Sequence, residues 1–225
     1  MVNMDYYHFV RREITPLLPG KSPANILEVG AGAGATLKWL KGLYPLTETT
    51  AVELNPTLSD ELKLNADIAI IGSIEEAFPQ LKAYDLILLL DVLEHLPDSA
   101  GTLRKLTQLL KPGGQVIVSV PNIAHLSVSI PLLLRRQFNY REAGILDRTH
   151  VRFFVEDTAV QLLNDAGLIV IKALVSGLQG SRAKLLDRLS CGLLRHYLAK
   201  QYIMLGQLSD KEFAQQKIRW AIAET

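Results

Sequence analysis

The chain has 225 residues, enough for one α/β domain with a sizeable core but without clear room for two. Hydrophobic residues make up 48% and charged residues 21%, an ordinary globular composition, and a net charge of +1 gives no electrostatic case for an obligatory nucleic-acid partner. The single cysteine, Cys191, excludes an internal disulfide and a cysteine zinc cluster and suits a reducing cytoplasm. The sequence shows no signal-peptide pattern and no membrane span, so we expect a cytoplasmic protein.

The first predicted element is a short helix. Residues 4–18 have apolar side chains at helical spacing, and Pro19-Gly20 then breaks the chain. We expect this helix to lie across the domain as packing. The alternative is a lid in which Tyr6 or Tyr7 reaches a ligand.

A strand, a glycine-rich turn and a helix follow. The apolar residues 26–29 lead into three alternate glycines, Gly30, Gly32 and Gly34, and a helical pattern covers residues 36–44. Glycine reaches positive φ without strain and lets a ligand approach the backbone closely. The helix N-terminus behind the turn offers free N–H groups.

Two ligand classes fit this turn. Gly30-x-Gly32-x-x-Ala35, with an acid at Glu53, satisfies the dinucleotide fingerprint. However, Glu28 stands at the lip of the turn, where a carboxylate would repel a pyrophosphate. It would suit a ligand that carries an ammonium and a sulfonium, such as S-adenosylmethionine (SAM). Glu53 ends the second predicted strand and can accept hydrogen bonds from both ribose hydroxyls.

Further strands and helices alternate along the chain. Continuous apolar runs indicate strands buried on both faces, which is typical of a parallel sheet; the predicted strands cover residues 49–53, 67–72, 84–90, 115–120, 168–175 and 201–205. This alternation predicts a doubly wound α/β sheet. Late in the chain we predict a basic amphipathic helix over residues 181–199 and a polar helix over residues 209–222.

Ionisable side chains follow the fourth strand at once. Asp91, Glu94 and His95 lie just beyond its carboxyl end, the edge at which open α/β sheets bind ligands. A neutral histidine suits proton removal near pH 7, so His95 is the best-placed candidate base. His125, after the fifth strand, and His150, in a charged and aromatic block, are the next candidates. Each histidine could instead have only a structural role.

Together these motifs resemble the class I SAM-dependent methyltransferase family. The similarity covers roughly residues 20–175, and it rests on the glycine turn of residues 28–34, Glu53, the motif of residues 91–96 and the turn of residues 110–114. The resemblance implies a Rossmann-like, doubly wound and mostly parallel seven-stranded sheet with helices on both faces, the last strand being antiparallel. As one domain over residues 1–225, it would comprise an N-terminal helix (1–20), a cofactor-binding half (20–120) and an acceptor-side half (121–225).

The resemblance also implies the cofactor site. The residues expected to contact SAM are Glu28, Gly30, Gly32, Gly34, Glu53, Leu54, Gly72, Ser73, Ile74, Asp91 and Val92. Many relatives carry Asp after the third strand, where the adenine amine is recognised. Serine, which stands here at Ser73, accepts a hydrogen bond less strongly.

The function predicted from this resemblance is methyl transfer from SAM to an oxygen of a small molecule, leaving S-adenosylhomocysteine. The block of residues 144–154 is similar to bacterial domains associated with small-molecule, quinone or surface-sugar methylation. Two alternatives stay open: an NAD-dependent oxidoreductase, against which Glu28 argues, and a non-catalytic SAM-binding module. The sequence leaves the acceptor and the oligomeric state open.

A metal site is a further alternative. Asp91-x-x-Glu94-His95 resembles the E-x-x-E-H arrangement of ubiquinone-pathway O-methyltransferases and small-RNA 2′-O-methyltransferases. A hard divalent ion would prefer such oxygen ligands. Because Asp91 replaces a longer glutamate, we predict no metal at this place.

Overall fold

One eight-stranded sheet organises the part of the chain that the structure describes. The computed structural model describes residues 7–178, 180–209 and 218–223. The strand order is β3-β2-β1-β4-β5-β7-β6-β8, and only β7 runs antiparallel to its neighbours β5 and β6. The strands are β1 (Asn25–Val29), β2 (Glu48–Glu53), β3 (Ile68–Ile71), β4 (Tyr84–Leu90), β5 (Leu110–Pro121), β6 (Leu168–Ser176), β7 (Gln201–Leu208) and β8 (Trp220–Ile222).

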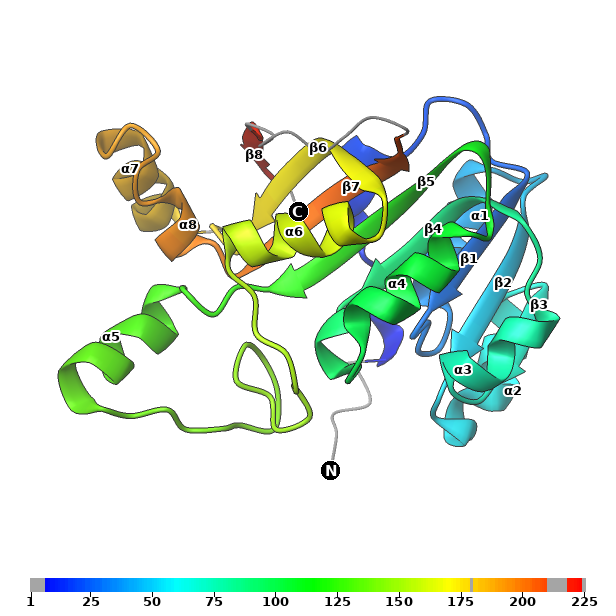
Figure 1. Cartoon of the computed structure of the whole chain (residues 1–225), viewed down its shortest axis with the longest axis horizontal. Helices are drawn as coiled ribbons and strands as arrows, with labels where there is room; N and C mark the ends of the chain where they lie inside the picture. The colour runs from blue at the N-terminus through cyan, green and yellow to red at the C-terminus, as the bar shows by residue number, and fades with distance from the viewer. Residues whose placement is uncertain (1–6, 179, 210–217, 224–225) are drawn as a thin grey trace.

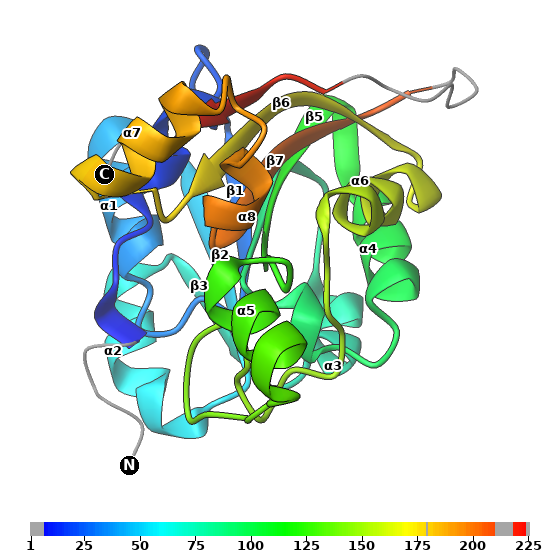
Figure 2. The same cartoon turned by 90° about the vertical axis from the view of Figure 1, so that its left-hand side faces the viewer.

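Helices cover both faces of this sheet (Figure 1, with the side view in Figure 2). On one face lie α3 (Ile74–Ala77), α4 (Ser99–Thr107) and α6 (Glu156–Asp165), whose buried side chains share a core with Leu27 and Val29 of β1. On the other face, α1 (Ala35–Leu43), α2 (Ser59–Asn65) and the 3-10 helix η2 (Arg12–Leu17) pack around Ile26. The strand alternation that sends Leu27 to one core sends Glu28 towards the other face.

Three helices lie beyond these layers. They are α5 (Leu126–Arg135), α7 (Ser181–Leu189) and α8 (Arg195–Leu198). Among the described residues, none of the helices combines the length and apolarity that a membrane crossing requires. Further short 3-10 helices are η3 (Pro56–Leu58), η4 (Phe78–Gln80) and η5 (Leu93–His95).

The predicted fold class is confirmed, including the antiparallel strand. An eighth strand was not expected. The prediction of a helix over residues 209–222 is wrong where the structure describes the chain, because Trp220–Ile222 pairs in parallel with β6. The ring of Trp220 is buried at 4.9 Å from that of Tyr202, which holds this short strand on the sheet. The rest of that predicted helix, residues 210–217, lies outside the described residues.

Two other predicted helices differ from the structure. The long helix over residues 181–199 is broken into α7 and α8, since Cys191 (φ 51°) and Gly192 (φ 83°) have left-handed backbone. The N-terminal segment forms short 3-10 turns instead of one helix, with Pro16 inside η2, and residues 4–6 lie outside the described part. Its expected packing is present, because Ile14 and Leu17 are fully buried.

The turn between β1 and α1 requires its glycines. Gly30, Gly32 and Gly34 have φ of 69°, 56° and 78°. The N-terminal segment crosses this turn: the backbone N–H of Ala33 donates to the carbonyl of Tyr7 at 3.0 Å. A Cβ on Gly32 would stand 2.8 Å from that same carbonyl oxygen. The turn and the segment that crosses it are therefore packed as one unit.

We predict that Gly32→Ala lowers the free energy of unfolding by about 1–2 kcal/mol, the cost of left-handed backbone for a residue with a Cβ. Gly42→Ala is the matched control, because Gly42 lies inside α1 and, beyond its own helix backbone and chain neighbours, no described atom lies within 4 Å of an added Cβ. This control should leave stability unchanged or raise it. Urea unfolding curves measure both variants, and equal stability of the two would contradict the role given to Gly32.

Candidate functional site

A buried arginine lies at the centre of the sheet's carboxyl edge. Arg11 donates to Glu13, to Asp91 at 2.8 Å and to Ser119 at 3.1 Å. Asp91 also accepts hydrogen bonds from Ser119 at 2.7 Å and from Gln201 at 2.7 Å. Burial disfavours the guanidinium charge, but Asp91 and Glu13 outweigh it and raise the pKa of Arg11. The N-terminal segment is thereby tied to β4, β5 and β7.

Glu28 is a buried carboxyl group at the glycine turn. One of its oxygens, Oε2, has no hydrogen-bond partner among the residues that the structure describes. Burial raises the pKa of Glu28 to about 8, with Arg11 lowering it and Glu53 raising it further. A free acceptor oxygen beside left-handed glycines fits the cationic amine of SAM, so the residues present are compatible with that cofactor.

Glu53 braces the glycine turn as well as ending β2. Its two carboxylate oxygens accept the backbone N–H of Gly32 and of Asn55, each at 2.8 Å. Each oxygen keeps a further lone pair, so the group can still accept ribose hydroxyls. Glu53 is only 8% exposed, so its carboxylate is not simply a solvated group at the end of a strand.

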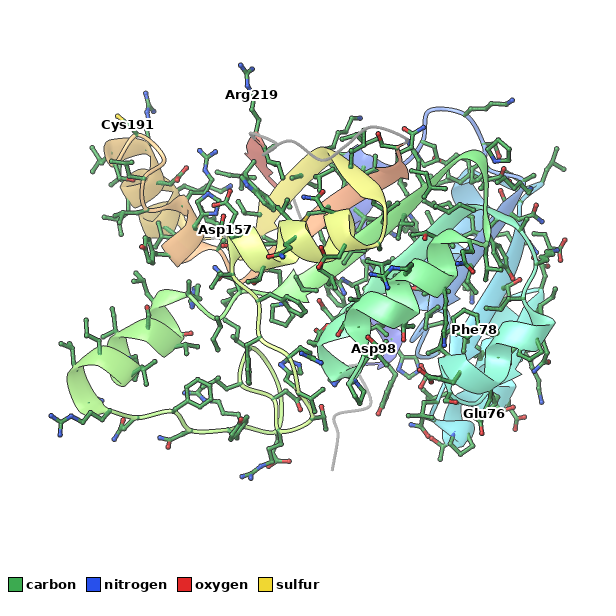
Figure 3. The ribbon with its side chains drawn as sticks, in the orientation of Figure 1. Glu76, Phe78, Asp98, Asp157, Cys191 and Arg219 are labelled. Atoms are coloured by element: carbon green, nitrogen blue, oxygen red, sulfur yellow. The ribbon has the colours of Figure 1, made fainter. Side chains whose placement is uncertain are left out.

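The segment after β3 has a structural role that the sequence did not indicate. Ser73 caps α3: its hydroxyl donates to Glu76 at 3.0 Å, and the Glu76 backbone N–H donates back at 3.3 Å. Glu76 is labelled at this place in Figure 3. Ile74 is buried in the core. Adenine recognition by Gly72, Ser73 and Ile74 stays a prediction, since the serine hydroxyl is already engaged.

Leu54 and Val92 differ in exposure around the predicted cofactor site, because Val92 is partly buried. Leu54 is 71% exposed after β2. Val92 packs on the glycine turn, because a Cβ on Gly30 would stand 2.6 Å from its Cγ2. Asp91, between β4 and Val92, has left-handed backbone (φ 59°), and its carboxylate is engaged with Arg11.

His95 is oriented by a short chain of hydrogen bonds. The hydroxyl of Thr149 donates to Asp147 at 2.6 Å. Its oxygen therefore accepts from His95, whose Nδ1 lies 3.0 Å away. This arrangement puts the ring proton on Nδ1 and leaves the lone pair on Nε2. Burial, then His150, lowers the pKa of His95, so the ring is neutral at pH 7.

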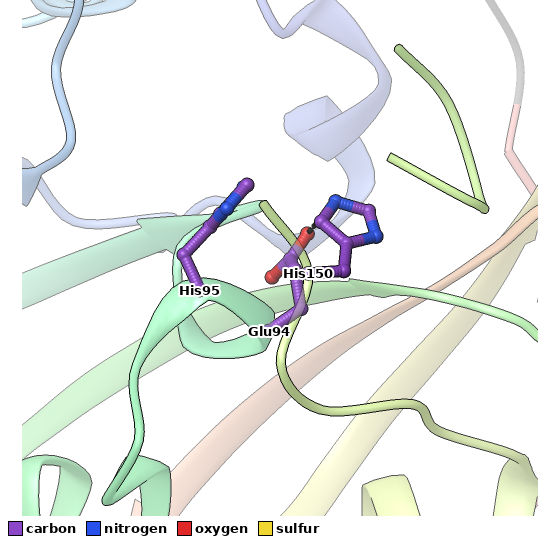
Figure 4. A group of neighbouring side chains, drawn as sticks. All are labelled: Glu94, His95 and His150. Carbon is purple, nitrogen blue, oxygen red and sulfur yellow. Dashed lines mark ion pairs between the residues drawn. The ribbon is translucent and has the colours of Figure 1, made fainter. Parts of the chain in front are cut away.

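His150 and Glu94 complete this group (Figure 4). The rings of His95 and His150 meet edge to face, with centroids 4.7 Å apart. His150 contacts the carbonyl of Ile145 through Nδ1 at 3.1 Å, and its Nε2 lies 4.0 Å from Glu94. Glu94 is fully buried, and within the described part of the chain neither carboxyl oxygen has a hydrogen-bond partner. Burial, then the charge of Asp91, raises its pKa well above the ordinary range.

The block of residues 144–154 is held on η5 by backbone bonds. The carbonyl of Glu94 accepts the N–H groups of Val151 at 2.9 Å and Arg152 at 3.0 Å. This contact brings His150 to His95 from far along the sequence. His125 does not join them: it caps α5, where its Nδ1 lies 3.1 Å from the backbone nitrogen of Ser127.

The metal arrangement considered from the sequence is not the one the structure offers. Ligand atoms of Glu94, His95 and His150 all lie within 4.8 Å of one another. Asp91 is outside this group, because Arg11, Ser119 and Gln201 take up its carboxylate. A divalent ion would therefore meet the two histidines and Glu94.

Sequence reasoning missed four residues of the site. Arg11 and Gln201 lie far from the recognised motifs, and no local spacing connects them to Asp91. Asp147 and Thr149 were within the charged and aromatic block, and their type and position could have suggested partners for a histidine.

We predict that Glu28 gives the unliganded protein a pH-dependent stability. The group titrates near its ordinary 4.5 when unfolded and at about 8 when folded. Between these values only the folded state holds the proton, so this contribution to the free energy of unfolding falls as pH rises. Glu28→Gln removes the titration. Urea unfolding from pH 5 to 8 should show wild type losing stability relative to the variant, and parallel curves would contradict the assignment.

Comparison with known proteins supports one family. The family model described as a methyltransferase domain matches residues 3–173. Methyltransferase str2 of Strobilurus tenacellus is 35% identical over 110 residues, 49% of this chain and 40% of that protein. A ubiquinone biosynthesis O-methyltransferase of Xanthomonas oryzae is 30% identical over 106 residues, 44% of each chain. The matched region thus spans less than half the length of these relatives.

The solved structures agree in fold. A SAM-dependent methyltransferase from Archaeoglobus fulgidus superposes with a TM-score of 0.62 over 87% of this chain and 90% of that one, at 17% identity. The topology, the glycine turn with its free acidic oxygen and the family match lead to the same conclusion. This chain belongs to the class I SAM-dependent methyltransferase family.

Proposed function

We propose that this protein methylates a hydroxyl oxygen of a small aromatic molecule, with His95 as the general base. The observation that carries the proposal is the chain from Asp147 through Thr149 to His95. It fixes the tautomer in which Nε2 is free to accept a proton. A neutral histidine at the carboxyl edge of the sheet is the group that an oxygen nucleophile requires.

Different residues of the protein would bind the cofactor and remove the proton of the acceptor. When bound, SAM supplies a methyl group on a cationic sulfur and leaves as S-adenosylhomocysteine. Glu28 would hold the cationic amine and Glu53 the ribose hydroxyls. His95 would take the acceptor's proton on Nε2 as the oxygen gains the methyl. Holding both reactants at near-attack distance supplies much of the rate.

Three aromatic side chains support an aromatic acceptor. The ring of Phe138 meets those of Tyr140 and Phe153 edge to face, with centroids 5.6 and 5.7 Å apart. They belong to the segment that carries Thr149 and His150. The relatives named above include an enzyme of ubiquinone biosynthesis, which agrees with a phenol or quinol as acceptor. The proposal also includes a cytoplasmic location, which agrees with the free thiol of Cys191.

A non-catalytic SAM-binding module is the second candidate, and turnover separates the two. A catechol or hydroquinone panel with SAM, read by mass spectrometry of the methylated product, provides the assay. Absence of turnover with the whole panel, despite S-adenosylhomocysteine binding, would favour the module.

We predict that His95→Ala lowers turnover by about 10²–10⁴-fold while cofactor affinity stays within a few-fold. His125→Ala is the comparison, because that residue caps α5 and should leave the rate nearly unchanged. Wild-type turnover should fall as pH drops through the lowered pKa of His95, because the base is then protonated. Full activity of His95→Ala would exclude this role. Loss of activity to a chelator, with recovery in Mg²⁺, would favour a metal at Glu94, His95 and His150.

Asp147 is tested as a positioning residue in the same assay. Asp147→Ala frees the Thr149 hydroxyl to donate to Nδ1 of His95. This favours the tautomer with the proton on Nε2, which cannot accept a proton there. Turnover should fall with KM nearly constant. The acid limb of the pH profile should move lower, because Asp147 raises the pKa of His95. If the pH profile of Asp147→Ala does not move, Asp147 has only a structural role.

We predict that Glu53→Ala weakens S-adenosylhomocysteine binding by about 1.5–3 kcal/mol, the range for a hydrogen bond to a charged group. It should also lower the melting temperature, because Gly32 and Asn55 lose their acceptor. Glu75→Ala, an exposed acid on α3, is the control. Isothermal titration measures both variants, with NAD as the competing ligand; binding of NAD alone would overturn the cofactor assignment.

A further inference from the structure

Two helical projections expose leucines at one end of the molecule. On α5, the exposed fractions of Leu132, Leu133 and Leu134 are 47%, 81% and 74%. After β6, those of Leu185, Leu189 and Leu193 are 56%, 72% and 80%. We call these six residues the leucine edge. Single exposed leucines are common, but groups of three on each of two projections from one end of the molecule indicate a binding surface.

Both projections leave the sheet at the same edge. β5 and β6 each run antiparallel to β7, so they are parallel to one another and their carboxyl ends coincide. α5 follows β5 and α7 follows β6. Figure 1 shows α5 and α7 at this end, standing away from the sheet, and Figure 2, which views this end face-on, shows the two helices on one surface of the molecule but apart from one another. The glycine turn and His95 follow the carboxyl ends of β1 and β4, at the same edge.

Cations accompany these leucines. Arg135 and Arg136 end α5, and Lys184 and Arg188 lie on α7, all of them exposed. Residues 123–141 contain no Asp or Glu, and residues 181–200 contain only Asp187. Asp187 is buried and paired with Arg195 at 2.9 Å. Within the described part of the chain these four cations form no ion pair, so the leucine edge is bordered by positive charge.

We propose that the leucine edge is a docking surface for an anionic lipid membrane. Exposed leucines beside Lys and Arg are the pattern of helices that lie in a membrane interface, and anionic head groups attract such cations. Two copies of this chain meeting here would instead place like charges together. The proposal concerns binding and does not rest on the methyl acceptor. A docked protein would hold the carboxyl edge of its sheet towards the lipid.

Sedimentation with vesicles tests the proposal. The full chain is mixed with vesicles of phosphatidylcholine, with or without an equal share of phosphatidylglycerol. We expect binding to the anionic vesicles, weaker binding to the neutral ones, and loss of binding as NaCl rises from about 0.1 to about 0.5 M. No binding to anionic vesicles would overturn the proposal.

A matched pair of variants locates the surface. Leu133→Glu/Leu193→Glu, with one substitution on each projection, should lower vesicle affinity by at least about tenfold. Leu46→Glu/Leu64→Glu is the control, because these leucines are 96% and 85% exposed but precede β2 and β3, at the opposite edge of the sheet. Circular dichroism melting shows whether both variants fold. Equal loss in both, or none in the first, would contradict the assignment.

A fluorophore attached to the single cysteine gives an independent measurement of vesicle binding. Cys191 is exposed at the turn after α7, as Figure 3 shows. A polarity-sensitive fluorophore there should shift to the blue with anionic vesicles, and one on Leu46→Cys/Cys191→Ser should not. The competing occupant is a second copy of the chain. A dimer that Leu133→Glu/Leu193→Glu dissociates, without a vesicle-induced shift, would replace the lipid proposal by self-association.

Discussion

The site depends on the charge balance around Arg11. A guanidinium buried beside Asp91 and Glu13 is stable only because the carboxylates neutralise it and Ser119 and Asp91 take its N–H groups. Removing one partner would leave an uncompensated buried charge, which typically destabilises a protein by about 3–5 kcal/mol. The same contacts fix the left-handed turn at Asp91. That turn sets the direction of η5 and therefore the positions of Glu94 and His95.

Two buried carboxyl groups near Arg11, those of Glu28 and Glu94, differ in their surroundings. Glu28 and Glu94 both have raised pKa values because burial disfavours their charged forms. Glu28 lies at the glycine turn, where a cationic ligand would compensate its charge. Glu94 lies between the β4 loop and the block of residues 144–154. Unsatisfied buried acids destabilise a fold, and their presence at one sheet edge is typical of a binding site.

The block of residues 144–154 links the two halves of the molecule. Its backbone bonds to the carbonyl of Glu94, its Thr149 orients His95, and its Phe153 packs with Phe138 and Tyr140 of the preceding segment. The aromatic group proposed for the acceptor and the side chain that orients the proposed base therefore belong to one continuous segment, residues 138–154. The leucine edge begins on α5, in the connection that leads into this block, so a surface that docks there would lie close to the acceptor side.

The sequence by itself determined the sheet, the glycine turn and the family, because continuous apolar runs, three alternate glycines and strand-end acids are local patterns with few structural solutions. It also placed Glu28, Glu53 and His95 at one edge. Only the tertiary structure decided which partners those groups have. Arg11 reaches Asp91 across 80 positions, and Thr149 reaches His95 across 54. The eighth strand could not be predicted from local sequence patterns, because it depends on the burial of Trp220 against the sheet. The break at Cys191 and Gly192 could not be predicted either, because their left-handed backbone is set by packing rather than by hydrophobic periodicity.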